Sequence, residues 1–322
     1  MNQESAFIDL VLQNPDDDGP RLVYADWLEE QGDCDHAEFI RLQCELARTQ
    51  ADDRRRLDSE YRQASLLLNH RQEWEPSFDR PFVGSQLRFE FVRGFPELHT
   101  DIHTFLALEY QFLAGFPVTM VHLDRDDEHP EDEDREFWDR LVLCPFLDRV
   151  ATINMFLIGA EVQLLLESPH LTRLQSLSAT LIEMTNRDAN QLASHPAMAS
   201  VTNLQLILAD ELRPHSEAAM TLGDEAARGI GASPLMSNLR RLSLAGNAVG
   251  NEGAAALANS PHLADLRHLD LATNHISERG ALALAESPFL QQLEWLGLAY
   301  NFPGPRGEEA LRKRFGEKVH LR

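Results

Sequence analysis

Leucines recur at a fixed interval in the last third of the chain. Leu242, Leu269 and Leu296 are 27 residues apart, and each lies within a stretch of the form LxxLxLxxN. Apolar and polar residues alternate there, which places the leucines on one face of a strand. An alanine-rich segment such as 254–259 follows and favours a short helix. One strand and one helix cannot bury their apolar faces alone, so the pattern predicts stacked strand–loop–helix units.

The same pattern extends toward the N-terminus with less regularity. We expect about seven repeats, whose strand anchors are Val121, Ile153, Leu177, Leu204, Leu242, Leu269 and Leu296. The intervals between these anchors are 32, 24, 27, 38, 27 and 27 residues, and the long ones mark insertions. The asparagine that ends the motif is present at Asn247, Asn274 and Asn301. In the earlier units its place is taken by Ile158, Ile182 and Ala209, so those turns must be closed differently.

This pattern resembles the leucine-rich repeats of the ribonuclease-inhibitor-like class. The resemblance implies an α/β solenoid with a parallel sheet inside and helices outside. It also implies that the asparagines bond to the backbone at each strand-to-loop turn, and that the side chains between the leucines form a concave binding face. The candidate protein-binding residues on that face are Asn203, Gln205, Arg241, His268, Asp270, Trp295 and Tyr300. Trp, Tyr and Arg are frequent binding hot spots, although Trp295 could instead only shield the last repeat.

Residues 1–80 have a different pattern, in which apolar residues recur at helical spacing. We expect helices that begin near Ser5 and Asp18, and two more over His36–Arg48 and Arg54–His70. Residues 4–48 resemble a bacterial "repeat-companion" domain that precedes repeat arrays, a family that implies no particular chemistry. We therefore predict a small all-α domain at 1–80. The solenoid would occupy 81–322, with a strand pair over 88–98 capping its N-terminal side.

The motifs of common catalytic and metal sites are missing. The sequence contains no GxGxxG, GxxxxGK[ST], HExxH or GxSxG. Cys34 and His36 lack the second ligand pair of a zinc site, so we interpret them as part of a polar turn between helices. Asp26 and Arg41 fall on predicted helices, where a structural ion pair is the expected role. We predict a protein that is not an enzyme and holds no cofactor or metal.

The charge is strongly negative and unevenly distributed. The chain has 322 residues and a net charge of −23, of which residues 1–80 contribute −10 and residues 81–160 contribute −9. This balance argues against nucleic acid and anionic membranes as partners. One acidic run, expected to be a solvated loop, comprises Asp124, Asp126, Asp127, Glu128, Glu131, Asp132, Glu133 and Asp134. A calcium loop is disfavoured because His129 stands where such a loop needs glycine.

These features predict a non-catalytic scaffold that binds a protein partner on the concave face of its repeats. One alternative is that the N-terminal domain is an enzyme or effector that the repeats direct to its target. Another is that the acidic loop captures a basic protein. We expect a monomer. We place it in the cytoplasm because the sequence starts without the features of a signal peptide and its three cysteines have no CxxC spacing.

Overall fold

The computed structural model describes residues 3–14, 17–49, 55–75, 87–108, 118, 120–124, 135–157, 159–181, 184–208 and 222–321. It divides into two compact units, unit 1 (Met1–Asp124) and unit 2 (Arg125–Arg322). The division differs from the expected boundary after residue 80, because the strands after that point are bonded to the helices. Gln43 accepts a hydrogen bond from the amide of Gly94 and donates one to the carbonyl of Phe91. That residues 1–80 form a domain with its own function stays a prediction.

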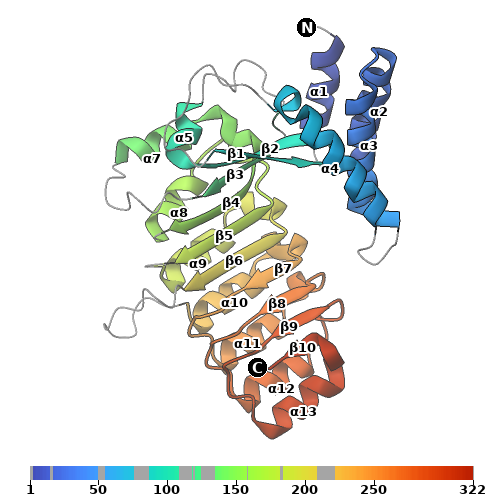
Figure 1. Ribbon diagram of the computed structural model, residues 1–322. Coiled ribbons are helices and arrows are strands. Elements are labelled where there is room, and N and C mark those ends of the chain that lie inside the picture. The colour runs from blue at the N-terminus through green and yellow to red at the C-terminus, as the bar shows by residue number, and fades with distance from the viewer. Residues whose placement is uncertain are drawn as a thin grey trace. The chain divides into compact units, whose positions relative to one another are not determined.

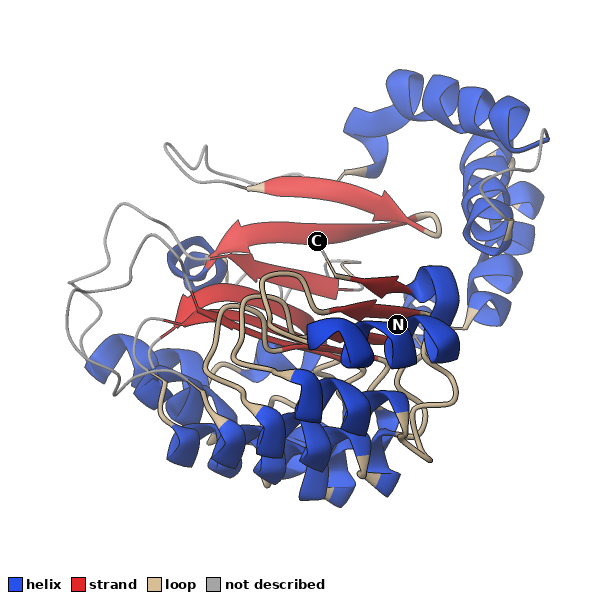
Figure 2. Cartoon of the chain, turned by 90° about the horizontal axis from the view of Figure 1, so that it is seen from below, coloured by secondary structure: helices blue, strands red, loops and turns tan. Residues whose placement is uncertain are grey.

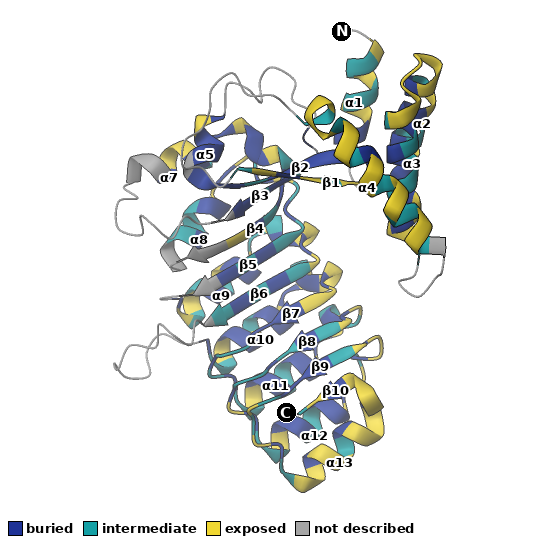
Figure 3. Cartoon of the chain, in the orientation of Figure 1, coloured by how far each residue is buried: buried dark blue, intermediate teal, exposed yellow. Residues whose placement is uncertain are grey.

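The first part of unit 1 consists of four helices. They are α1 (Gln3–Gln13), α2 (Asp18–Glu30), α3 (Cys34–Arg48) and α4 (Arg55–Trp74), close to the expected segments. Asp17 and Asp33 cap α2 and α3 by accepting bonds from the amides of Gly19 and His36, respectively. In Figure 3, most of the length of α4 is exposed, whereas Leu66 is buried and Trp74 packs against Phe39 of α3.

The second part of unit 1 adds strands to these helices. It contains β1 (Arg88–Val92), β2 (Phe95–Asp101), α5 (Ile102–Ala107) and β3 (Met120–Asp124). Strands β1 and β2 form the expected hairpin, whose turn residues Arg93 and Gly94 both have positive φ. Only glycine fits at the second position, since a Cβ there would lie 2.5 Å from Cγ1 of Ile40. The anchor Val121 lies on β3, which pairs in parallel with β2.

Unit 2 is a parallel sheet with helices along one side (Figures 1 and 2). Its strands are β4 (Val150–Leu157), β5 (Ser176–Leu181), β6 (Asn203–Leu208), β7 (Arg241–Ser243), β8 (His268–Asp270), β9 (Trp295–Gly297) and β10 (Val319–His320). Its helices are α7 (Arg135–Val142), α8 (Gly159–Leu166), α9 (Asn186–Ala193), α10 (Asp224–Ala232), α11 (Asn251–Ala258), α12 (Glu278–Ala285) and α13 (Gly304–Phe315). Each strand from β4 to β10 pairs in parallel with its neighbour in chain order, where the pairing is described.

The strand register of unit 2 is the one that the leucine spacing predicts. The core row of the sheet consists of Ile153, Leu177, Leu204, Leu242, Leu269 and Leu296 in direct register. Each of these side chains is at most 1% exposed. Val319 of β10 continues the row beside Leu296 as a last, short edge strand. The predicted parallel α/β arrangement is therefore confirmed for unit 2, and the count of seven repeats stays a prediction.

Candidate functional site

Two rows of side chains flank the core row of unit 2. The first row is Thr152, Ser176, Asn203, Arg241, His268 and Trp295, and the second is Asn154, Ser178, Gln205, Ser243, Asp270 and Gly297. Because successive residues of a strand point to opposite faces, both rows lie on the sheet face opposite the buried leucines. We call this surface the sheet face. Toward the last repeats it changes from small polar side chains to charged and aromatic ones.

The sheet face contains a hollow of ≈ 240 Å³ over β6–β9, which we call the sheet-face hollow. It is lined by Gln205, Ile207, Arg241, Leu242, Ser243, His268, Asp270 and Trp295. Five of the seven candidate binding residues therefore come together there. The sixth, Asn203, is Arg241's neighbour in the first row and donates a 2.7 Å bond to the hydroxyl of Ser176. The seventh, Tyr300, lies on the loop after β9, where its side chain is 80% exposed.

Trp295 is held in position by stacking and by a missing side chain. Its ring is stacked with those of His268 and His320, at centroid distances of 6.2 and 5.1 Å. A Cβ on Gly297 would come 2.3 Å from Cη2 of Trp295, so only glycine leaves room for the indole there. Asp270 also crowds that position, with Oδ1 2.6 Å from the same Cβ site. His320 was missed as a site residue, although its place on the last strand could have indicated it.

Within the described ranges, Arg241 and Asp270 of the hollow form no ion pairs. Arg240 and Arg267 each directly precede a residue of the first row. Arg240 pairs with Asp265 at 3.0 Å, and Arg267 pairs with Glu294 at 3.1 Å. Arg241 is exposed and has no ion-pair partner within the part of the chain that the structure describes. Burial raises the pKa of Asp270, while a 3.0 Å bond from the amide of Ala272 acts in the opposite direction. The hollow thus offers a free guanidinium, a half-buried carboxyl group and an aromatic surface.

The turn asparagines occupy the positions and make the bonds that the resemblance implies. The side-chain nitrogen of Asn274 donates to the carbonyls of Leu244, Leu271 and Ala272, at 2.8 to 3.1 Å, and its oxygen accepts from the amide of Val249 at 2.8 Å. Asn247 and Asn301 repeat this arrangement one unit earlier and one unit later. Ile158, Ile182 and Ala209, the substitutes in earlier units, lie outside the described residues.

A second series of side chains caps the helices of unit 2. In each case a side-chain Oδ1 accepts a hydrogen bond from a backbone amide of the following unit. The pairs are Asn186 with Gly223, Asp224 with Gly250, and Asn251 with Ser277. Each oxygen therefore caps the helix of the following unit, which has no side-chain cap of its own. Sequence reasoning missed this series. The 38- and 27-residue spacing from Asn186 to Asp224 and Asn251 was a signal that could have found it.

The remaining predictions concern the acidic run, metal binding, membrane crossing and the pair Asp26–Arg41. Asp124 ends β3, and the rest of the acidic run, residues 125–134, lies outside the described residues. Within the described ranges, no group of three or more His, Cys, Asp or Glu side chains could hold a metal ion. None of the described helices is long and apolar enough to cross a membrane. Arg41 forms the expected structural pair with Asp26, at 2.6 Å, and a second one with Glu29.

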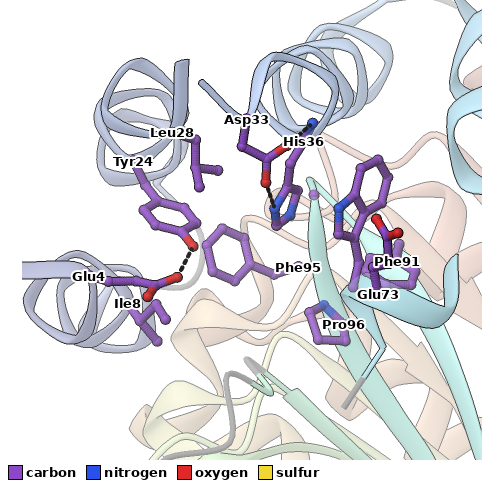
Figure 4. A pocket seen from close by; sticks show the side chains of 12 residues that line it. Glu4, Ile8, Tyr24, Leu28, Asp33, His36, Glu73, Phe91, Phe95 and Pro96 are labelled. Carbon is purple, nitrogen blue, oxygen red and sulfur yellow. Dashed lines mark hydrogen bonds and ion pairs between the residues drawn. The ribbon is translucent and has the colours of Figure 1, made fainter. Parts of the chain in front are cut away.

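Unit 1 has a pocket that sequence reasoning did not anticipate (Figure 4). This unit 1 pocket has a volume of ≈ 320 Å³. It is lined by Glu4, Ile8, Tyr24, Leu28, Asp33, His36, Glu73, Trp74, Phe91, Gly94, Phe95 and Pro96. These residues come from α1, α2, the turn before α3, α3, α4 and the β1–β2 hairpin, and they share no fixed spacing. No pattern along the chain therefore predicts that these residues line one pocket.

The comparisons with known proteins bear on the regular repeats. The family model described as Leucine Rich repeat matches residues 236–258 and 262–285. The first stretch includes β7 and α11, and the second includes β8 and α12, so each match covers one strand and the helix after it. No curated protein matches the chain. Together with the register of β7–β9 and the asparagine bonds, the family match identifies this part of the chain as leucine-rich repeats.

Proposed function

We propose that the chain is a non-catalytic binding module, a leucine-rich-repeat solenoid that holds a protein partner on its sheet face. Leucine-rich repeats generally mediate protein–protein interaction, which supports a binding role for this surface. Such a role needs a broad surface with a few strong anchors, because a small part of an interface usually carries most of the binding energy. The small polar side chains over β4–β6 supply breadth, and the sheet-face hollow supplies the anchors.

The observation that carries this proposal is the meeting of Arg241 and Trp295 in one hollow. Arg241 can donate two parallel bonds to a carboxylate of the partner, since no described ion pair occupies it. Trp295 offers a flat apolar surface whose orientation is fixed by the stacked imidazoles of His268 and His320. A preformed anchor costs little conformational entropy when the partner binds.

The partner's chemistry follows from the same hollow. A segment that carries a carboxylate next to a flat or aromatic side chain would contact Arg241 and Trp295 together. Gln205 and Asp270 would accept the backbone or side-chain donors that enter with it. We further propose that the module acts as a monomer, needs no cofactor and does not bind nucleic acid.

The test is a capture experiment followed by an affinity measurement. The tagged full chain is used to isolate partners from lysate of the source cells, and mass spectrometry identifies the most enriched protein. Its affinity is then measured for the wild type and for the double variant Arg241→Ala/Trp295→Ala. We expect the double variant to lose more than about 2 kcal/mol, or about 30-fold.

The matched control is Arg240→Ala, which removes the neighbouring arginine that pairs with Asp265. We expect it to change the affinity less than about twofold, because exposed ion pairs contribute little. An unchanged affinity in the double variant would contradict the proposal. An equal loss in Arg240→Ala would also contradict it, since the effect would then be general to the surface charge.

A further inference from the structure

We propose that the unit 1 pocket binds an organic cation, in the form of an ammonium group carried on an apolar stem. This inference concerns a different unit from the sheet-face hollow and does not depend on the function proposed for it. It rests on the chemistry of the walls, the carboxylates at the pocket and the cations that are missing from its lining (Figure 4).

Five of the twelve residues that line the pocket carry aromatic rings. Tyr24 and Phe95 lie 5.7 Å apart between ring centroids, and His36 stacks on Trp74 at 4.7 Å with an interplanar angle of 17°. Phe91 adds a further ring, and Figure 4 shows it on the same side of the pocket as Glu73. Aromatic faces attract cations through their quadrupoles, and Trp and Tyr rings do so most strongly. An apolar stem would find contacts on Ile8, Leu28 and Pro96.

Three carboxylates line the pocket together with these rings. Glu4 accepts a 3.2 Å bond from the hydroxyl of Tyr24, which fixes one carboxylate at the edge of the aromatic wall. Asp33 bonds to the amide of His36 at the start of α3. Glu73 is engaged by His70, whose Nδ1 lies 2.9 Å from it, and this bond raises the pKa of His70. Glu4 and Asp33 therefore present most of the negative charge that a ligand would meet.

No lysine or arginine is among the described residues that line the pocket. Burial lowers the pKa of His36 to about 4, so its imidazole is neutral near neutral pH and does not repel a cation. Arg21 contacts the Phe95 ring at 5.7 Å, but it is 2% exposed and is not part of the lining. Its charge is opposed by Asp18 and Glu97. A volume of ≈ 320 Å³ is at the small end of ligand sites, which suits an alkylammonium group or one lysine side chain.

The experiment is a calorimetric titration of the full chain at constant ionic strength. The probes are n-butylammonium chloride, the peptide Gly-Gly-Lys-Gly-Gly with blocked termini, and the neutral alcohol n-pentanol. We expect saturable binding of at least one cationic probe, with a Kd on the order of 1 mM, and binding of n-pentanol at least about tenfold weaker. Tighter binding of the peptide would indicate a protein lysine as the natural ligand, and tighter binding of butylammonium would indicate a free amine.

Variants locate the binding in the pocket. Glu4→Gln keeps the bond to Tyr24 but removes a charge, and Trp74→Leu removes an aromatic wall. We expect each to weaken binding about fivefold. The matched control is Glu75→Gln, since Glu75 pairs with Arg71 and does not line the pocket. Absence of saturable binding by both cations, equal binding of n-pentanol, or equal losses in Glu4→Gln and Glu75→Gln would each overturn the proposal. Glu4→Gln keeps the test decisive if Trp74→Leu fails to fold.

Discussion

The helices of unit 1 and the regular repeats of unit 2 are stabilised in different ways. In the repeats, buried or partly buried side chains bond to the backbone at the same positions every 27 residues, as Asn247, Asn274 and Asn301 do. In unit 1, exposed ion pairs join residues at no fixed spacing, such as Arg62 with Glu38 and Arg41 with Asp26. Buried hydrogen bonds are insensitive to salt and to moderate pH, whereas surface charges are screened and titratable groups respond to protons. The two units should therefore fail under different perturbations.

The largest difference should follow from Asn274→Ala. This substitution leaves one buried amide and three carbonyls without their side-chain partner, so we expect a loss of about 4 kcal/mol in the free energy of unfolding. Hydrogen exchange should show the loss in β7–β9, with α1–α4 unaffected. The control is Asn259→Ala, an exposed asparagine whose side chain bonds to the carbonyl of Ala255, for which we expect less than about 1 kcal/mol. Equal effects of the two substitutions would contradict a special stabilising role for the buried turn asparagine.

Acid should act on unit 1 through His36. Burial lowers its folded-state pKa to about 4, while the unfolded value is about 6.5. Between these two pKa values the unfolded state binds more protons than the folded state. The contribution of neutral His36 to the free energy of unfolding is therefore fully present above pH 6.5 and is lost as the pH falls to 4. The loss should amount to roughly 3 kcal/mol.

The variant His36→Gln isolates this contribution, because it leaves His70 on α4 in place. The bond to Glu73 raises the pKa of His70, which is opposite to the shift of His36. Hydrogen exchange of α1–α4 between pH 7 and pH 4 is the measurement. If wild type and His36→Gln lose stability in parallel over this range, the assignment to His36 is wrong.

The smallest effect should come from a turn that the repeats share. The residue before each turn asparagine has positive φ, and it is Gly246 in one unit but Thr273 and Tyr300 in the next two. Thr273→Gly should remove backbone strain and raise the free energy of unfolding by about 1 kcal/mol. Thr273→Ala keeps the Cβ and should leave stability nearly unchanged. Thermal unfolding compares the two, and identical melting temperatures for both variants would argue against strain at this turn.

The same contrast explains which features could be predicted from the sequence. The register from Ile153 to Leu296 followed from leucine spacing, because each repeat contacts its neighbours in an identical way. Five residues of the sheet-face hollow followed from that register. The stack of His320 on Trp295 did not, because it depends on the space left by Gly297.

Unit 1 was less predictable beyond its helices. Its strands share a compact unit with α1–α4, because the Gly94 turn lies directly against Ile40 of α3. The lining of the unit 1 pocket runs from Glu4 to Pro96 and comes from α1, α2, α3, α4, β1, β2 and two turns. Contacts between residues so far apart depend on how the helices and the hairpin pack. The sequence of unit 1 has no repeat that would indicate this packing.

We propose that the partner lies on the sheet face over the last repeats. Site-specific photo-crosslinking tests it directly, with a photoreactive amino acid placed at His268 in the hollow or at Arg279 on α12, among the helices. Both positions lie in the same repeat, so differences in folding or expression are minimised. The account predicts a crosslinked partner from position 268 and none from position 279. A crosslink from position 279 alone, or equal crosslinks from both, would contradict it.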